Sequence, residues 1–385
     1  MRITDIRTMC LSRPHEPERQ WRTATFLVPK ADCTVVLIET DEGVEGLGEA
    51  CSYGTPPRIA AEVERLKADL VGCDPVDAVP PRPVGLNPPV DTAAAGIDSA
   101  LWDLRGKLAG QRTCELLTEQ TPLTRIRLYA SGGVDYDWEN NPESVVDEAL
   151  AYVDAGYTAF KMRIGTHWAW AGVTVERMLE LLEAVTDAVD GRMELMLDGN
   201  QRLTEAEALQ IAQALSEWGW NWFEEPIPQT DIDGYARLNA AAAIRISGGE
   251  QYTTVEQFEP YLKDKAYAIV QQDVGWCGLT EGMRIARRAV EFGVPTCPHN
   301  WHNGLMAMAN AHLVAALPDT AGHPHLLELN MFQGPLQWDM LKYKPRIEAG
   351  YLYLPDAPGL GVELAEDVAA RFPFVEGPWG INIER

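Results

Sequence analysis

The sequence predicts an α/β fold in which a barrel of alternating strands and helices follows an α+β unit. From Arg125 onward, short apolar runs typical of strands alternate with amphipathic stretches typical of helices, over the length that a (β/α)8 barrel needs. Three of these runs also end in an acid, at Asp198 in MLDGN, Glu224 in WFEEP and Glu250 in SGGE. The acids are 26 residues apart, near the roughly 30 residues of one βα unit.

Composition narrows the class of protein. The chain has 385 residues, of which 46% are hydrophobic, so it can bury a large core. A formal net charge of −25 disfavours nucleic acid and anionic membranes as partners. The seven cysteines form no CxxC pair, the N-terminus has no apolar signal-peptide core, and no run reaches the ~18 apolar residues of a membrane span. These features predict a cytoplasmic enzyme with reduced thiols.

The first third of the chain begins with antiparallel strands. Residues 2–12 predict a strand, and residues 31–50 predict a hairpin whose turn lies at Asp41-Glu42-Gly43. The polar loop between them holds Trp21. A helix is expected over residues 57–71, and the prolines of residues 74–91 predict an irregular connection.

The clearest helical pattern lies in residues 91–110. Its apolar residues recur at helical spacing, Asp91 or Thr92 can cap its start, and Gly110 stands where a C-terminal glycine belongs. Residues 1–122 therefore predict an α+β domain, residues 123–350 a barrel, and residues 351–385 a tail that returns to the first domain.

The barrel pattern gives eight strands with helices between them. The strands are predicted at residues 126–131, 158–163, 193–198, 220–225, 244–250, 267–273, 293–298 and 326–330. Helices are predicted at residues 142–155, 173–189, 204–218, 255–263, 279–292 and 304–316.

The three acids predict a divalent-metal site. A single acid at a strand end is more often a helix cap or an ion-pair partner. Three on consecutive strands aim three hard oxygen ligands at one point, which favours Mg2+ held by Asp198, Glu224 and Glu250. Alternation along the strand points Glu225 elsewhere, and Asn200 is expected to face the pocket as a hydrogen-bonding group.

Two cations are expected on the same inner face. Lys161 and Arg163 are two residues apart, so Met162 points the other way. A solvated surface pair is the alternative. Facing inward, the two cations would offset the acids and hold a substrate carboxylate.

A histidine and an acid end two further predicted strands. Asp273 can orient one imidazole nitrogen of His299 and leave the other free for proton transfer. His302 lies one turn beyond His299, and its role stays open between a structural and a substrate-binding one. Glu328 completes the polar ring, whereas His15, His167, His312, His323 and His325 are expected to be structural.

Aromatic residues are expected to shape the substrate pocket. They are Trp21, Tyr53, the loop of residues 166–170, Trp276 and Trp301, together with His302.

Taken together, these motifs resemble the enolase superfamily, in particular its mandelate racemase subgroup. The resemblance rests on DGN, FEEP, GGE, KMR, the Asp273–His299 arrangement and ALWDLRGKLAG, and it covers nearly the whole chain. It implies a modified TIM barrel, (β/α)7β, under an N-terminal α+β capping domain completed by the C-terminal tail. It further implies one Mg2+ on the three acids, a His299–Asp273 base dyad, an electrophilic acid at Glu328, and assembly as dimers or octamers.

One position departs from the subgroup. Its usual motif is Lys-x-Lys, whose second lysine is a base opposite the histidine, and here that position is Arg163. Arginine does not give up its proton, so a reaction that needs only one base is favoured. Lys161 is expected to clamp the substrate carboxylate. It would act as a base only if burial among cations lowered its pKa.

The expected activity is therefore syn dehydration of a sugar acid, an aldonate or aldarate, to a 2-keto-3-deoxy acid, with His299 moving the proton. A racemase, epimerase or cycloisomerase of the same superfamily is the alternative within enzymes. A non-catalytic protein that binds acid sugars is the alternative from another class.

Overall fold

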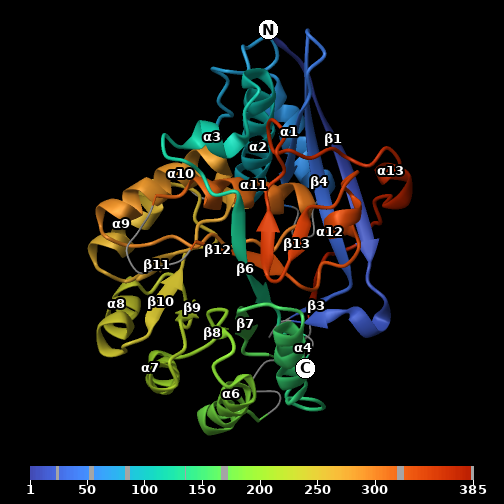
Figure 1. Cartoon of the computed structure of the whole chain (residues 1–385). Helices are drawn as coiled ribbons and strands as arrows, with labels where there is room; N and C mark the ends of the chain where they lie inside the picture. The colour runs from blue at the N-terminus through green and yellow to red at the C-terminus, as the bar shows by residue number, and fades with distance from the viewer. Residues whose placement is uncertain are drawn as a thin grey trace.

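The first domain is a three-stranded antiparallel sheet covered by two helices. The computed structural model describes residues 1–22, 26–51, 56–82, 87–134, 136–165, 172–318 and 325–382. Strands β1 (Ile3–Pro14), β4 (Lys30–Thr40) and β5 (Gly46–Ala50) pair in the order β1-β4-β5. The hairpin predicted at residues 31–50 is therefore present. Helices α1 (Pro56–Lys67) and α2 (Pro88–Ala109) lie beside this sheet (Figure 1).

Strand β4 is buried on both faces, because another part of the molecule covers each face. Val36 and Ile38 pack with residues of α1 and α2. Cys33 and Val35, on the other face, pack with residues of the barrel helix α11 (Gly304–Ala316). Because side chains alternate between the two faces of a strand, one face of the sheet packs on its own helices and the other packs on the barrel.

Helix α2 begins three residues earlier than the sequence pattern indicated. The predicted caps Asp91 and Thr92 are wrong: the N-cap is Asn87, and Pro88 opens the helix. Proline is tolerated in the first turn of a helix, because the N–H groups there have no partner within the helix. Pro88 therefore begins α2 instead of preventing it. Gly110 ends the helix in the left-handed region at φ 66°, as predicted.

The second domain is the predicted barrel. Its parallel strands are β6 (Arg125–Ser131), β7 (Ala159–Arg163), β8 (Glu194–Asp198), β9 (Trp222–Glu224), β10 (Arg245–Gly248), β11 (Ile269–Val270) and β12 (Leu326–Asn330). They pair in sequence order, β12 returns to β6, and a single bridge from Val270 to Thr296 stands where the seventh strand was expected.

The barrel interior is a packed layer rather than a pore. Neighbouring strands each contribute one inward side chain, and these form a buried cluster of Tyr129, Ala159, Met196, Trp222, Ile269, Cys297 and Leu326. This layer lies below the carboxyl ends of the strands, where the polar residues gather. Such layering is the usual way in which these barrels are filled.

Helices connect the barrel strands and surround them (Figure 1). They are α4 (Ser144–Asp154), α6 (Val175–Val189), α7 (Glu205–Glu217), α8 (Ile232–Ala241), α9 (Val255–Lys263), α10 (Val274–Glu291) and α11. The sequence pattern did not single out α8. Helix α10 begins directly after Asp273, five residues before the predicted start, because Asp273 caps it.

The C-terminal tail returns to the first domain. Strand β15 (Ile381–Asn382) pairs with β3 (Phe26–Val28), which pairs with β2 (Trp21–Arg22). Pro373 bridges to Leu11, and Lys30 donates a hydrogen bond to the Val375 carbonyl. Ahead of these contacts, β13 (Arg346–Glu348) and β14 (Tyr351–Tyr353) extend the barrel sheet beside β6. The boundaries at residues 122 and 350 stay a prediction.

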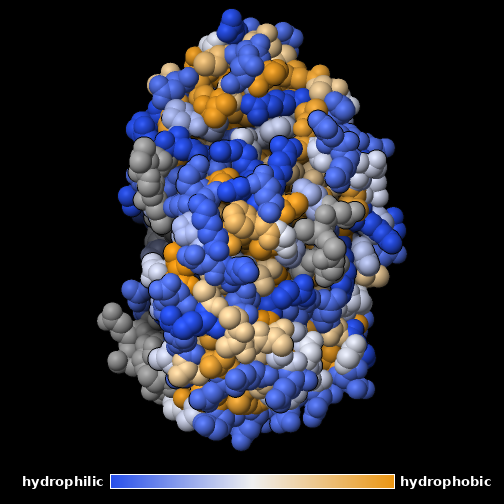
Figure 2. Space-filling model, turned by 90° about the vertical axis from the view of Figure 1, so that its left-hand side faces the viewer, coloured by the Kyte–Doolittle hydropathy of each residue, from blue (hydrophilic) through white to orange (hydrophobic). Residues whose placement is uncertain are grey.

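The surface is largely hydrophilic on the face drawn in Figure 2. On this face, apolar residues are scattered between the hydrophilic ones. Among the described residues, no helix has the length and apolar content needed to cross a membrane.

Candidate active site

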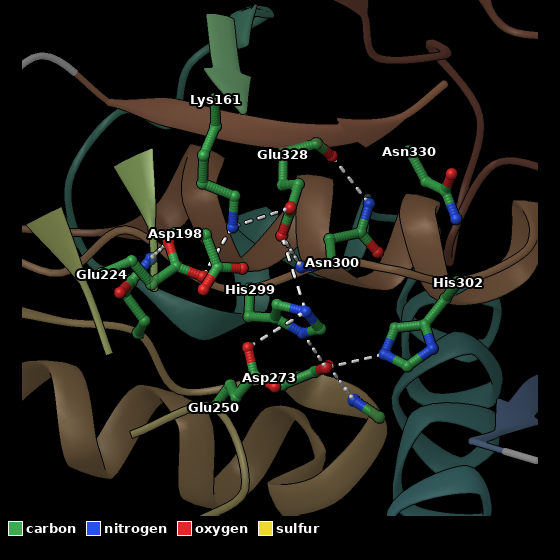
Figure 3. Close-up of polar contacts among 12 residues, drawn as sticks. Lys161, Asp198, Glu224, Glu250, Asp273, His299, Asn300, His302, Glu328 and Asn330 are labelled. Atoms are coloured by element: carbon green, nitrogen blue, oxygen red, sulfur yellow. Dashed lines mark hydrogen bonds and ion pairs between the residues drawn. The ribbon is translucent and has the colours of Figure 1, made fainter. Parts of the chain in front are cut away.

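The predicted acids meet at the carboxyl ends of neighbouring strands. Asp198 is the register partner of Arg163 on one side and of Glu224 on the other. Glu250 follows β10, in which Ser247 is the register partner of Glu224. Figure 3 shows these side chains together with Lys161, His299 and Glu328 at one rim of the barrel.

Lys161 is a fully buried cation between two acids. Its ammonium nitrogen Nζ lies 2.5 Å from Glu224 Oε1 and 3.0 Å from Glu328 Oε1. Burial alone would lower the pKa of Lys161, but Glu224, Glu328 and Asp198 together raise it above its ordinary value. Lys161 was expected to act as a base only if cations surrounded it. The structure instead places it between acids. Lys161 is a fixed positive charge.

Arg163 faces the same space as Lys161, as the period of two predicts. Its Nε lies 3.7 Å from Asp198 Oδ2, and its guanidinium carbon lies 4.3 Å from the centre of the Trp301 ring. Stacking on an indole holds the planar guanidinium in one orientation. Arg163 is therefore a second fixed cation.

His299 is held by Asp273 and surrounded by further carboxylates. Its Nδ1 lies 2.7 Å from Asp273 Oδ2, and its Nε2 lies 3.3 Å from Glu250 Oε2. The Nδ1–H donates to Asp273, so Nε2 is the nitrogen that faces the acids. Burial alone would lower the pKa of His299, but Glu250, Glu328 and Asp273 together raise it to about 9.

Glu328 is held as a carboxylate rather than as a carboxylic acid. Burial opposes its charge, but Lys161, His299 and the hydrogen bond from the Asn300 N–H keep the pKa of Glu328 well below its usual range. A proton-donating acid must carry its proton at working pH, and these partners disfavour that form. The electrophilic role that the resemblance implied for Glu328 stays a prediction.

Two consecutive residues after β8 adopt left-handed backbone conformations. Asn200 has φ 45° and Gln201 has φ 61°. Asn200 donates its backbone N–H and its side-chain Nδ2 to Asp198, at 2.8 and 3.0 Å, so it orients this acid as well as facing the cavity. Non-glycine residues at positive φ are uncommon and cluster at functional sites.

Glu225 belongs to this cluster, although strand alternation had pointed it elsewhere. Strand β9 ends at Glu224, and Glu225 has φ 33°, which turns its side chain toward the cavity. Gln201 donates to its carboxylate at 2.7 Å, and burial together with Glu250 and Asp198 raises the pKa of Glu225. The Glu-Pro step gave no signal for this turn, because a residue before proline ordinarily keeps extended backbone.

The acid cluster fits a divalent cation. Burial, together with Asp198, Glu328 and Glu250, raises the pKa of Glu224 to about 7 against the opposing effect of Lys161. Such crowding of buried carboxylates leaves negative charge unbalanced, and all the donor atoms are hard oxygens, the set that Mg2+ prefers. The assignment of Asp198, Glu224 and Glu250 as its ligands stays a prediction.

The ligand atoms of Asp198, Glu224 and Glu250 do not all lie within 4.8 Å of one another, whereas those of a different group do. In the parts of the chain that the structure describes, Asp273, His299 and His302 alone form a group of at least three such side chains whose ligand atoms all lie within 4.8 Å. Their contacts are hydrogen bonds, because Asp273 Oδ2 lies 2.7 Å from a ring nitrogen of each histidine. The distances within the group would allow a metal ion. However, each short contact is an imidazole–carboxylate hydrogen bond, which already occupies the atoms that a metal would need.

The site opens into a cavity of about 510 Å3. Polar residues line one part of it, and indoles line another. The described residues around it are Trp21, Arg163, Asn200, Gln201, Arg202, Glu225, Glu250, Gln251, His299, Trp301 and Trp379. Trp21 packs edge-on against both Trp301 and Trp379, at 5.3 and 5.8 Å between ring centres.

The structure places some expected pocket residues elsewhere. His302 and Trp276 are not among the described residues that line this cavity, and His302 lies behind Asp273 instead. Trp379 was missed, because nothing in the local sequence shows that the tail reaches the barrel mouth. Tyr53, His323 and residues 166–170, with His167, lie outside the described residues.

The remaining histidines differ in their partners. His312 lies between the Cys114 N–H and the Leu360 carbonyl, a structural position, as expected. For His15, burial lowers the pKa to about 4, which favours the neutral ring of a structural histidine. His325 directly precedes β12.

The fold and this rim define an enzyme of the enolase superfamily. Residues 5–118 match the mandelate racemase/muconate lactonizing enzyme N-terminal domain, and residues 144–368 match the enolase C-terminal domain-like family. The chain belongs to the mandelate racemase/muconate lactonizing enzyme subgroup of this superfamily.

Two relatives match this sequence over nearly its whole length. D-galactarolactone cycloisomerase of Agrobacterium fabrum is 31% identical over 97% of this chain and 99% of its own length. Arabinonate dehydratase of Saccharolobus solfataricus is 29% identical over 96% and 99%, respectively.

Solved structures show the same architecture. An enolase superfamily member from Polaromonas sp. JS666 superposes with a TM-score of 0.85 at 30% identity, covering 98% of this chain and 99% of its own. The 3,6-anhydro-D-galactonate cycloisomerase from Zobellia galactanivorans gives a TM-score of 0.81 at 28% identity, with 97% and 99% covered.

Proposed function

We propose that the protein is a Mg2+-dependent lyase that dehydrates a sugar acid, an aldonate or aldarate, to a 2-keto-3-deoxy acid. The observation that carries the proposal is the single base. His299 is oriented by Asp273, whereas the position opposite holds Arg163, which keeps its proton. Several relatives are named as dehydratases of arabinonate, galactonate or xylonate, which supports the same class of substrate.

Proton movement follows from the His299 tautomer. His299 Nε2 takes the proton from the carbon next to the substrate carboxylate, and the C–H electron pair forms an enolate. The enolate then expels the β-hydroxyl, which leaves as water with the proton returned by the His299 imidazolium. The enol product becomes the keto acid, so one water is lost in total and no oxidant or reductant is needed. The carboxylates around His299 favour the imidazolium, the form that returns the proton. Proton abstraction requires the neutral ring, and Mg2+ held by Glu250 would favour that form by offsetting the charge of this carboxylate.

The cations stabilise the charge that the proton transfer creates. Removing the α-proton places a second negative charge on the substrate carboxylate. Lys161 and Arg163 remain positively charged, and preorganised charges of this kind are the largest catalytic contribution in many enzymes. Buried partners hold both side chains in place, so these cations need to move little as the charge forms.

The metal fits this scheme as a further positive charge. Asp198, Glu224 and Glu250 would hold Mg2+, which supplies Lewis-acid stabilisation to an enolised carboxylate. Asn200 keeps Asp198 oriented through two hydrogen bonds.

Cycloisomerisation is the second candidate, because two observations favour it. A D-galactarolactone cycloisomerase is among the relatives, and three indoles line the cavity of this chain. Apolar ring faces suit a compact cyclic acid better than an extended polyol. In that case the leaving group is a ring oxygen that stays in the product, and His299 returns the proton to it.

The test is a library of sugar acids and their lactones, incubated with enzyme and Mg2+ in D2O and followed by NMR. Dehydration gives a 2-keto-3-deoxy acid, cycloisomerisation gives an isomer that retains every heavy atom, and epimerisation gives the inverted substrate. His299→Asn separates enzyme from binding protein: it retains substrate binding and loses turnover. Failure of every library member to exchange its α-proton or react sinks the proposal.

A further inference from the structure

His299 shares its carboxylate with a second histidine. Asp273 Oδ2 lies 2.7 Å from His299 Nδ1 and 2.7 Å from His302 Nε2, and Asp273 Oδ1 accepts the Gly275 N–H at 2.7 Å. The two rings meet the carboxylate from different sides, with an interplanar angle of 90° (Figure 3). An oxygen has two acceptor positions, so the two imidazole N–H groups occupy both.

The shared carboxylate is buried and charged. Asp273 is fully buried; burial opposes its charge, but His302 and His299 lower its pKa to about 2. The direction in which this carboxylate points is therefore fixed by three donors. Removing one donor leaves the other two to set its orientation.

His302 fits closely in its place behind Asp273. A Cβ atom added at Gly275 would lie 2.6 Å from His302 Nε2 and 3.1 Å from Asp273 Oδ1. Only the absence of a side chain at this first turn of α10 lets the ring approach the carboxylate. His302 is 3% exposed and does not line the large cavity; it lines a small neighbouring cavity that shares Trp301 and Trp379 with the large one.

The capping domain holds the segment that carries both histidines. Glu49 of β5 accepts hydrogen bonds from the backbone N–H groups of Asn303 and Met306, at 3.3 and 3.0 Å. It therefore caps the N-terminus of α11 from another domain. The Asn303 side chain also donates to the Asp32 carbonyl of β4, at 2.9 Å.

Cys51 joins the same set of contacts. It hydrogen-bonds to His302 and follows β5, so the ring is held between the capping domain and Asp273. The capping domain thus holds the segment that carries His299 and His302 both through its backbone N–H groups and through the His302 ring.

We propose that His302 is a positioning residue for His299, acting through the Asp273 carboxylate that they share. The inference rests on the proposed function, in which His299 moves the proton. His302 fixes one lone pair of Asp273 Oδ2 and leaves the other for His299 Nδ1. This arrangement sets the ring plane of His299 and the direction of its Nε2. A base that is misplaced by about 1 Å loses on the order of 100-fold in rate.

The experiment compares matched substitutions at two buried histidines. His302→Asn shortens the side chain and removes the donor to Asp273, whereas His302→Gln carries an amide N–H close to the place of Nε2. His312→Asn makes the same change at a histidine bonded to the Cys114 N–H and the Leu360 carbonyl, away from Asp273. Gly275→Ala keeps His302 but crowds its ring, and to a lesser extent Asp273 Oδ1, so it tests the contact if His302→Asn fails to fold.

Steady-state kinetics give the first readout. We expect His302→Asn and Gly275→Ala to lower kcat and the α-proton exchange rate by about 10- to 100-fold with little change in KM. His302→Gln recovers part of the loss, and His312→Asn keeps the wild-type kcat. Wild-type kcat in both His302→Asn and Gly275→Ala overturns the inference. So does a rise in KM alone, or an equal loss of kcat in His312→Asn.

Proton NMR gives a readout that needs no substrate. Wild-type protein is expected to show two downfield imidazole N–H resonances from the pairs with Asp273. His302→Asn loses one and shifts the other, whereas His312→Asn leaves both. An unshifted His299 resonance in His302→Asn overturns the positioning role. If wild-type enzyme turns over no sugar acid, the proposed function fails, and the NMR comparison still decides this inference.

Discussion

Neutral His312 joins three separate segments, and this makes the stability of the fold dependent on pH. His312 belongs to α11, accepts the Cys114 N–H of α3 (Thr113–Leu117) at Nδ1, and donates from Nε2 to the Leu360 carbonyl of the tail. Protonation of Nδ1 would place two N–H groups face to face. Burial lowers the pKa of His312 from its ordinary 6.5 to about 4, with the Leu360 hydrogen bond opposing.

The sign and the size of the effect follow from these two values. The unfolded chain takes up this proton below about pH 6.5 and the folded protein only below about pH 4, so stability falls as the pH drops through this window. A pKa difference of about 2.5 corresponds to about 3 kcal/mol in full. At pH 5 about 2 kcal/mol of this is already lost.

The assay is urea unfolding of wild-type protein and His312→Asn at pH 7 and pH 5. The asparagine Oδ1 can accept the Cys114 N–H but does not titrate, so the variant is less stable at pH 7 and lacks this contribution to the pH dependence. Other groups, such as His15, contribute equally to both proteins and cancel in the comparison. We expect wild-type protein to lose about 2 kcal/mol more than the variant between the two pH values. Equal losses would refute the reasoning, since His312 would then titrate alike in both states.

Further predictions concern the site. Lys161→Met leaves Glu224 and Glu328 buried without their cation. We therefore expect loss of turnover and a fall of about 3–5 kcal/mol in the free energy of unfolding, measured in urea. Unchanged stability would contradict the pairing of Lys161 with these acids. Arg163→Lys loses the stacking of the planar guanidinium on Trp301, which is worth about 0.5–2 kcal/mol, so we expect KM to rise about 2- to 30-fold. NMR of the products also shows whether the new amine permits epimerisation. Chelation of divalent metal should abolish turnover, and Mg2+ should restore it; full activity in a metal-free preparation would exclude the metal role.

Much of the architecture was predictable because it depends on local patterns. The strand-end acids, the period of two in Lys161 and Arg163, and the left-handed Gly110 all follow from the spacing of residues along the chain. The hairpin of β4 and β5 follows from its apolar run and its turn residues.

The remainder depends on contacts between distant segments. No local pattern shows that Glu49 caps α11, that Trp379 reaches the cavity, or that His302 shares Asp273 with His299. Glu225 was misplaced because period-two alternation applies only inside a strand, and β9 ends one residue earlier. The start of α2 was missed because the prolines were treated as breakers, although the first turn tolerates them.

The cap supplied by β5 to α11 has a consequence for protein engineering. Chimeras that combine a capping domain from one relative with a barrel from another are an attractive route to new substrate preferences. Here the transplanted domain must bring an acceptor at the position of Glu49, because Asn303 and Met306 otherwise lose their partner in the loop that carries His299. Domain exchange would therefore change the chemistry of the barrel along with the shape of the pocket.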